Sequence, residues 1–99
     1  MRKLVRDKIP EMIQNPKTEI LTNDNDFFKS LIEKLFEEIK EFEEAENNDE
    51  LTSEMGDVLE VLYALCDFKK INLNEIEKKR IKKLEERGGF KKRILLIKE

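Results

Sequence analysis

This sequence predicts an all-α fold, an antiparallel bundle of about three to four helices, on three observations. Alanine, glutamate, lysine, leucine and arginine make up 51 of the 99 residues, which is typical of long amphipathic helices. Three glycines and two prolines are too few for a turn-rich β-sandwich or barrel. Apolar residues recur at helical spacing through the middle of the chain. A chain of this length is expected to form a single domain over residues 1–99.

The N-terminal region is predicted to form a short helix over residues 3–14. Pro10 has to lie in its first turn or break it, because proline has no backbone N–H. Asn15-Pro16 is a stop signal for this helix. Residues 18–22 are interpreted as an extended connection to the next element.

Two long helices form the middle of the predicted bundle. Asp24 or Asp26 can cap the first helix, which is expected over about 27–46. The second helix is expected over about 50–69, and Asn47 lies three residues before a glutamate, as in a capping box. The short polar connection between the two helices predicts an antiparallel hairpin.

The C-terminal part is predicted to contain a third helix and a short final segment. Asn72 and Glu75 have capping-box spacing at the start of this helix, and Gly88-Gly89 ends it. Residues 90–97, FKKRILLI, are interpreted as a short strand or an extended tail. No repeat and no low-complexity linker indicates a second domain.

Residue types that the chain lacks exclude several kinds of chemistry. The sequence contains no histidine, so imidazole cannot act as a base, a nucleophile or a metal ligand. Cys66 is the only cysteine, which excludes an internal disulfide and fits a reducing compartment, so a cytoplasmic location is expected. No apolar run approaches the roughly 18 residues of a membrane span, and no apolar segment at the start indicates a signal peptide.

Charge is sorted along the chain. Residues 33–60 contain twelve acidic side chains and two lysines, whereas residues 61–99 contain twelve basic and six acidic side chains. One interpretation is that these are solvated helix faces that pair with each other. The other is an acidic cation site facing basic groups, an arrangement that suits a phosphorylated ligand.

The first long helix places two glutamates beside its apolar face. At 100° per residue, one stripe collects Phe28, Leu31, Ile32, Leu35, Ile39 and Phe42. Glu38 lies at the edge of this stripe, and Glu41, three residues later, can share a ligand with it. Glu37 lies on the far side, so it is expected to face solvent or to support the site indirectly.

The second long helix places two acids on an apolar face. Glu54 and Asp57 project in the direction of Val61 and Ala64. From residue 58 to residue 68 this helix is apolar nearly all round, so we expect it to be the most buried element. Buried carboxylates without partners are costly, so such groups are paired, protonated or bound to a cation.

Folding the two helices into a hairpin about Asn48 brings the four acids together. Glu41 becomes level with Glu54, and Glu38 with Asp57. Four clustered carboxylates cannot all stay ionised without cations. Ligation by oxygen alone selects a hard ion, so the pattern predicts Mg²⁺, with Mn²⁺ as a substitute.

A second interpretation of the same cluster needs no metal. Lys34, Lys40 or the basic third helix would then neutralise the carboxylates. The hairpin spacing favours a bound cation, because buried groups of like charge require compensation at close range.

These residues resemble the all-α NTP pyrophosphatase superfamily, the MazG-like and phosphoribosyl-ATP pyrophosphohydrolase-like proteins. Its EExxE and ExxD motifs match residues 37–41 and 54–57. The N-terminal KLVRDKIP, residues 3–10, and RGGF, residues 87–90, resemble a small single-domain branch of that group. The resemblance implies a MazG-like helical domain.

The activity that the resemblance implies is Mg²⁺-dependent hydrolysis of a nucleoside triphosphate to a monophosphate and pyrophosphate, of the house-cleaning kind. It implies that Glu38, Glu41, Glu54 and Asp57 hold the metal. Glu38 or Glu41 is then the catalytic residue that accepts the proton of the attacking water, and the sequence does not choose between them.

The resemblance also assigns basic residues to the substrate phosphates. These are Lys34, which precedes EExxE, and Lys83 and Arg87, which lie one turn apart on the third helix. The other interpretation of Lys83 and Arg87 is pairing with glutamates on an exposed helix. Relatives bury the apolar faces of such hairpins in dimers or tetramers, so self-association is expected.

A second hypothesis is a helical oligomerisation or nucleotide-binding regulatory module that does not hydrolyse its ligand. A third is nucleic-acid binding through the basic residues 78–93. The net charge of −3 and the acidic residues 33–60 argue against nucleic acid as a partner. No membrane partner is expected either.

Overall fold

The computed structural model describes residues 2–98 and has an all-α fold, as predicted. It contains a short 3-10 helix, η1 (Pro10–Met12), and three α-helices, α1 (Asp24–Glu44), α2 (Asn48–Phe68) and α3 (Leu73–Arg87). No strand occurs within residues 2–98. No helix in this range is long and apolar enough to cross a bilayer.

The described chain forms two compact units, one ending at Lys69 and one beginning at Lys70, and each is described by itself. The first contains η1, α1 and α2, and the second contains α3 and the C-terminal segment. The organisation of the whole chain as a single domain stays a prediction.

The helix predicted over residues 3–14 is wrong, because this region contains only the three-residue η1. Pro10 is the first residue of η1, so no helix continues through it from the N-terminal side. Asn15 has a φ of 51°, the left-handed conformation that an asparagine tolerates and that stops a helix. The N-terminal segment is therefore extended or turned for most of its length.

Asparagine side chains begin the two long helices. The predicted cap of α1, Asp24 or Asp26, is wrong, because Asn23 caps this helix. Its Oδ1 accepts from the N–H of Asp26 at 3.0 Å. Asn47 caps α2 as predicted, and its Oδ1 accepts from the N–H of Glu50 at 2.9 Å. The Glu50 carboxylate in turn accepts from the N–H of Glu46 at 2.9 Å. These bonds set the register at which α2 begins.

Replacing Asn47 by alanine is expected to destabilise the protein by about 1 kcal/mol, because a helix N–H then loses its acceptor. For a chain of this size the melting temperature falls by ~4–8 °C per kcal/mol. Thermal unfolding followed by circular dichroism measures the change. Thr52→Ala is the control, since Thr52 bonds only a carbonyl within the same helix and should have the smaller effect.

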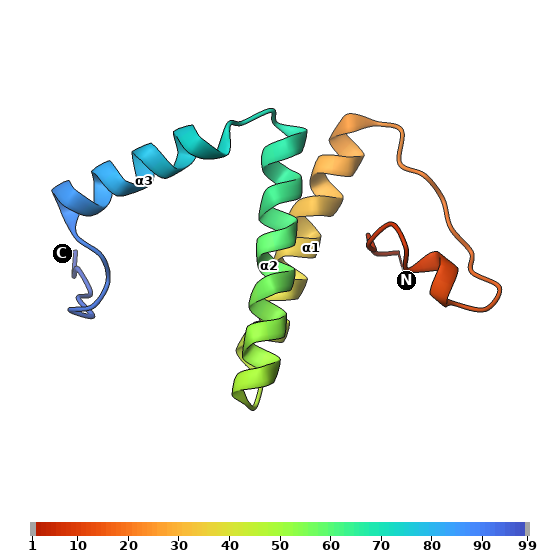
Figure 1. The fold of residues 1–99 in the computed structure, drawn as a ribbon, viewed down its shortest axis with the longest axis horizontal. Coiled ribbons are helices and arrows are strands. Elements are labelled where there is room, and N and C mark those ends of the chain that lie inside the picture. Colours follow the sequence, from red (N-terminus) through yellow and green to blue (C-terminus); the bar gives the residue numbers. More distant parts are fainter. Residues whose placement is uncertain (1, 99) are drawn as a thin grey trace. The chain divides into compact units, whose positions relative to one another are not determined.

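Helices α1 and α2 pack side by side in an antiparallel hairpin (Figure 1). The buried apolar side chains of residues 2–98 all lie between them and are Leu31, Val58 and Val61. At the end of the hairpin away from the connection between α1 and α2, the ring of Phe68 stacks on that of Phe28 with 5.8 Å between centroids. The hairpin therefore has a narrow core along one face of each helix.

The prediction that residues 58–68 form the most buried element is wrong for the first unit by itself. Leu59, Leu62 and Tyr63 remain 43%, 39% and 51% exposed. Helix α1 covers one side of α2, and the apolar residues on the remaining side have no cover within the described residues of the first unit.

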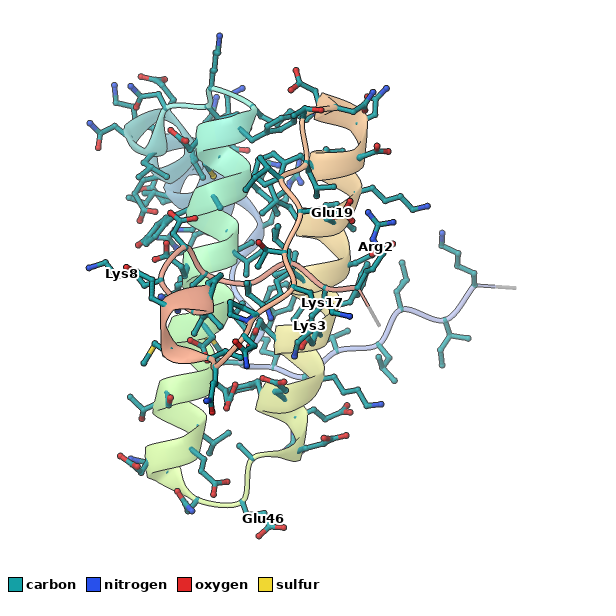
Figure 2. All side chains as sticks on the ribbon, turned by 90° about the vertical axis from the view of Figure 1, so that its right-hand side faces the viewer. Arg2, Lys3, Lys8, Lys17, Glu19 and Glu46 are labelled. Atoms are coloured by element: carbon teal, nitrogen blue, oxygen red, sulfur yellow. The ribbon has the colours of Figure 1, made fainter. Side chains whose placement is uncertain are left out.

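The N-terminal segment crosses one face of the hairpin (Figure 2). Lys3 lies over α1 and Lys8 beside α2 in this view. Arg2 pairs with Glu19 farther along the same segment. Ion pairs to both helices hold the crossing, and they bring basic groups onto the acidic part of the hairpin.

In the second unit, Asn72 caps α3 as predicted and accepts from the N–H of Glu75 at 3.2 Å. Helix α3 ends at Arg87 because Gly88 adopts a φ of +80°, which favours glycine. Residues 90–98 form no strand. Of the two alternatives for this segment, the tail is the one that the structure supports.

Candidate functional site

Three glutamates converge where α1 and α2 face each other. Glu38 and Glu41 project from α1, and Glu54 projects from α2. One carboxylate oxygen from each residue lies within 4.8 Å of the other two, so a single ion can contact all three. Helical periodicity and the predicted hairpin about Asn48 had indicated that these three carboxylates lie close together.

Glu38 is the buried member of the cluster, with only 6% of its surface exposed. Its Oε1 pairs with Nζ of Lys34 at 3.2 Å, whereas its Oε2 is buried without a hydrogen-bond partner. Oε2 of Glu54 is also buried without a partner. Such unpartnered oxygens are costly, so the site lacks positive charge or donors.

Lys34 provides only part of the missing charge. Its Nζ is shared with Glu37 at 3.3 Å, and one ammonium faces the three carboxylates of the cluster. Burial by itself lowers the pKa of Lys34, but the bonds to Glu38 and Glu37 outweigh it and raise the pKa overall. Neutralisation by Lys34 alone is therefore incomplete, and Lys34 acts as a fixed cation at one edge of the site.

The pKa of Glu38 records the same shortage of positive charge. Burial raises this pKa, Lys34 opposes the shift, and the nearby Glu41 carboxylate adds to it. The net direction is upward, so the ionised form of Glu38 is disfavoured relative to an exposed glutamate. A divalent cation in contact with the cluster would reverse this effect.

The donor set fits a hard divalent cation. All three side chains offer carboxylate oxygens, and two of these oxygens are buried without partners. Mg²⁺ and Mn²⁺ prefer such ligands. Glu41 is exposed, so the cluster is open to solvent on one side and can receive an ion and a ligand.

Asp57, the fourth predicted ligand, is directed to another partner. Its Oδ1 accepts a hydrogen bond from Nη2 of Arg6 at 2.7 Å, and it is not part of the three-glutamate cluster. Its role as a metal ligand stays a prediction. Sequence reasoning did not find Arg6 as a partner of Asp57. The signal that could have found it is the group of basic residues in the KLVRDKIP segment, to which no role was assigned.

Glu37 lies outside the cluster, as expected from its position on the helix. It accepts from Lys3 at 3.2 Å and from Lys34 at 3.3 Å. Burial alone would raise the pKa of Glu37, but these two lysines lower it overall. Glu37 thereby orients Lys34, the lysine that also contacts Glu38.

Lys83 and Arg87 lie on α3 in the second unit. They line a cavity of about 670 Å³ together with Arg80 and Phe90. Neither residue forms an ion pair within residues 2–98, whereas Arg80 pairs with a neighbouring glutamate of α3. Their assignment to substrate phosphates stays a prediction.

A sequence model described as phosphoribosyl-ATP pyrophosphohydrolase matches residues 1–84. The match spans the N-terminal segment, both helices of the hairpin and Lys83, and it ends before Arg87. No significant match occurs among curated proteins or among solved structures.

Proposed function

Because this chain belongs to the phosphoribosyl-ATP pyrophosphohydrolase family, we propose that it is a Mg²⁺-dependent enzyme that cleaves a nucleoside triphosphate between its α and β phosphates. The products are a nucleoside monophosphate and pyrophosphate. The observation that carries the proposal is the pair of buried, unpartnered oxygens on Glu38 and Glu54, beside Glu41. They form a site for a divalent cation in a family of pyrophosphohydrolases.

The residues of the hairpin have distinct roles in this proposal. Glu38, Glu41 and Glu54 hold the cation, with Asp57 as a fourth ligand. When bound, the cation supplies positive charge that offsets the charge developing on the phosphate oxygens. Lys34 adds a fixed positive charge beside Glu38.

A carboxylate of α1 accepts the proton of the attacking water. Glu41 is exposed and meets solvent directly, whereas Glu38 is buried and paired with Lys34, so either carboxylate can take this role. Glu38 and Glu41 are three residues apart, so the group that does not take the proton remains beside the one that does.

The substrate is proposed to be a nucleoside triphosphate, and the family description names phosphoribosyl-ATP. That compound carries the same triphosphate, so cleavage of either kind of substrate requires the same cation and the same basic groups. A house-cleaning role would extend the proposal to triphosphates with altered bases.

A pyrophosphate-release assay tests the activity. Purified protein with Mg²⁺ is given phosphoribosyl-ATP, the standard nucleoside triphosphates and altered-base triphosphates, and each reaction is repeated with Asp57→Asn. We expect release from at least one substrate, and a loss of about tenfold or more in the variant. A folded protein that binds nucleotide but releases no pyrophosphate would support the regulatory module instead.

We also propose that the chain self-associates through the uncovered side of the hairpin. On α2, Met55, Leu59 and Leu62 form one stripe at helical spacing, and each is 39–43% exposed. Phe36 and Ile39 on α1 are 66% and 46% exposed. Apolar side chains grouped in this way are typical of an interface rather than of a solvated surface.

A further inference from the structure

The N-terminal segment places a single arginine on the acidic part of the hairpin. Nη2 of Arg6 donates to Oδ1 of Asp57 at 2.7 Å, across 51 residues of sequence. The side chains are 54% and 36% exposed, so water reaches both partners. Exposed ion pairs of this kind contribute little to stability, and their partners can be exchanged.

Arg6 lines the cavity beside the glutamate cluster. This cavity has a volume of about 440 Å³, and its charged lining residues are Arg6, Asp7, Lys8, Lys34, Glu38, Asp57 and Glu60. A volume of this size accommodates a small ligand. The basic groups come from the N-terminal segment and α1, and the carboxylates come from both helices and from Asp7, so the cavity suits an anion and a cation bound together.

Asp57 cannot serve Arg6 and a divalent cation equally well. It lies three residues after Glu54 on α2, one turn beyond a member of the cluster. A cation that recruits Asp57 places a second positive charge next to the guanidinium, and like charges at that distance repel. A cation that is bound by the cluster and also by Asp57 therefore releases Arg6 from its carboxylate.

We propose that Arg6 is a substrate-binding residue held on Asp57 in the free protein, and that it binds a phosphate of the nucleotide once a divalent cation occupies the cluster. A guanidinium suits this exchange because its planar donors match the oxygens of a carboxylate and of a phosphate equally well. The inference rests on the proposed function and adds a residue of the N-terminal segment to its site.

The proposal predicts two opposite effects of replacing Arg6 by alanine. Without nucleotide, Mn²⁺ binds several-fold more tightly, because Asp57 is no longer occupied. With saturating Mg²⁺, the affinity for α,β-methylene-ATP, whose α–β bridge cannot be hydrolysed, falls about tenfold through loss of a bond to a charged group. Electron paramagnetic resonance measures the first affinity and calorimetry the second.

Two further variants separate this role from simple attachment of the segment. Arg2→Ala removes another ion pair of the N-terminal segment, with Glu19, and both affinities should stay unchanged. Arg6→Lys keeps the charge but not the planar fork, so Mn²⁺ affinity should stay near that of the original protein while nucleotide affinity is intermediate.

Each remaining outcome contradicts the proposal in a distinguishable way. Unchanged nucleotide affinity in Arg6→Ala, with or without tighter Mn²⁺ binding, makes Arg6 a counter-ion of Asp57 and nothing more. If Arg2→Ala changes the two affinities as much as Arg6→Ala does, the loss of nucleotide affinity is due to detachment of the N-terminal segment. If the original protein binds Mn²⁺ but no analogue, the phosphate site is absent; if it binds no Mn²⁺, the proposed function fails and this inference with it.

Discussion

Replacing Glu38 by glutamine is expected to lower pyrophosphate release at least about 100-fold. Loss of groups that only support a metal ligand already costs ~10–100-fold, and Glu38 is proposed to contact the cation directly. Glutamine keeps the shape of the side chain but removes the charge. The measurement is kcat/KM with Mg²⁺ on whichever substrate the protein hydrolyses best.

The same variant should be more stable than the original protein when no cation is present. The pKa of Glu38 is raised in the folded state, so its stabilising contribution is complete below the ordinary glutamate pKa and is lost as pH rises through the raised value. Where Glu38 is ionised, its charge therefore opposes folding. Glutamine avoids that cost and can donate to neighbouring carboxylates, a gain of about 1 kcal/mol.

Thermal unfolding with and without Mg²⁺ checks both statements together. The original protein should melt at a higher temperature when Mg²⁺ is added, since a ligand that binds only the folded state stabilises it. The Glu38→Gln variant should have a higher melting temperature without Mg²⁺, and this temperature should rise little when Mg²⁺ is added. Glu43→Gln, an exposed change on the same helix, should behave as the original protein. A variant that remains fully active, or that responds to Mg²⁺ normally, would falsify the proposed role of Glu38.

Placing glutamates at Leu59 and Leu62 together is expected to convert an oligomer into monomers. Each leucine is proposed to be covered by a second copy, and burial of such a side chain contributes ~1.5–3 kcal/mol. Two substitutions should therefore raise the dissociation constant at least about 100-fold. Sedimentation equilibrium over a range of protein concentrations measures this constant.

The matched control for this surface is Ser53→Glu. Ser53 is exposed on α2 and lies on the opposite side of the helix from the leucine stripe, so the added charge should leave the association unchanged. Circular dichroism shows whether the double variant keeps its helices. If the original protein is a monomer at high concentration, or if the double variant associates as strongly, this face is not the interface.

Local signals in the sequence predicted the helices well where capping and periodicity agreed. Asn47 and Asn72 begin their helices as the capping-box spacing indicated. The N-terminal helix was wrong because Pro10 begins a helix of only three residues, and no helix continues through it from the preceding residues. The cap of α1 is Asn23 and not Asp24 or Asp26, since several neighbouring side chains could have provided it.

The sequence alone determined that the acids of two helices would converge, because helical periodicity and a short connection leave few ways to orient Glu38, Glu41 and Glu54. Only the tertiary structure decided that Arg6 lies on Asp57, since a segment without regular periodicity carries no signal for where it packs. The sequence also does not determine what covers the apolar stripe Met55, Leu59 and Leu62 of α2. Periodicity marks an apolar face, but which neighbour covers it depends on packing between elements far apart in the chain, or in another copy.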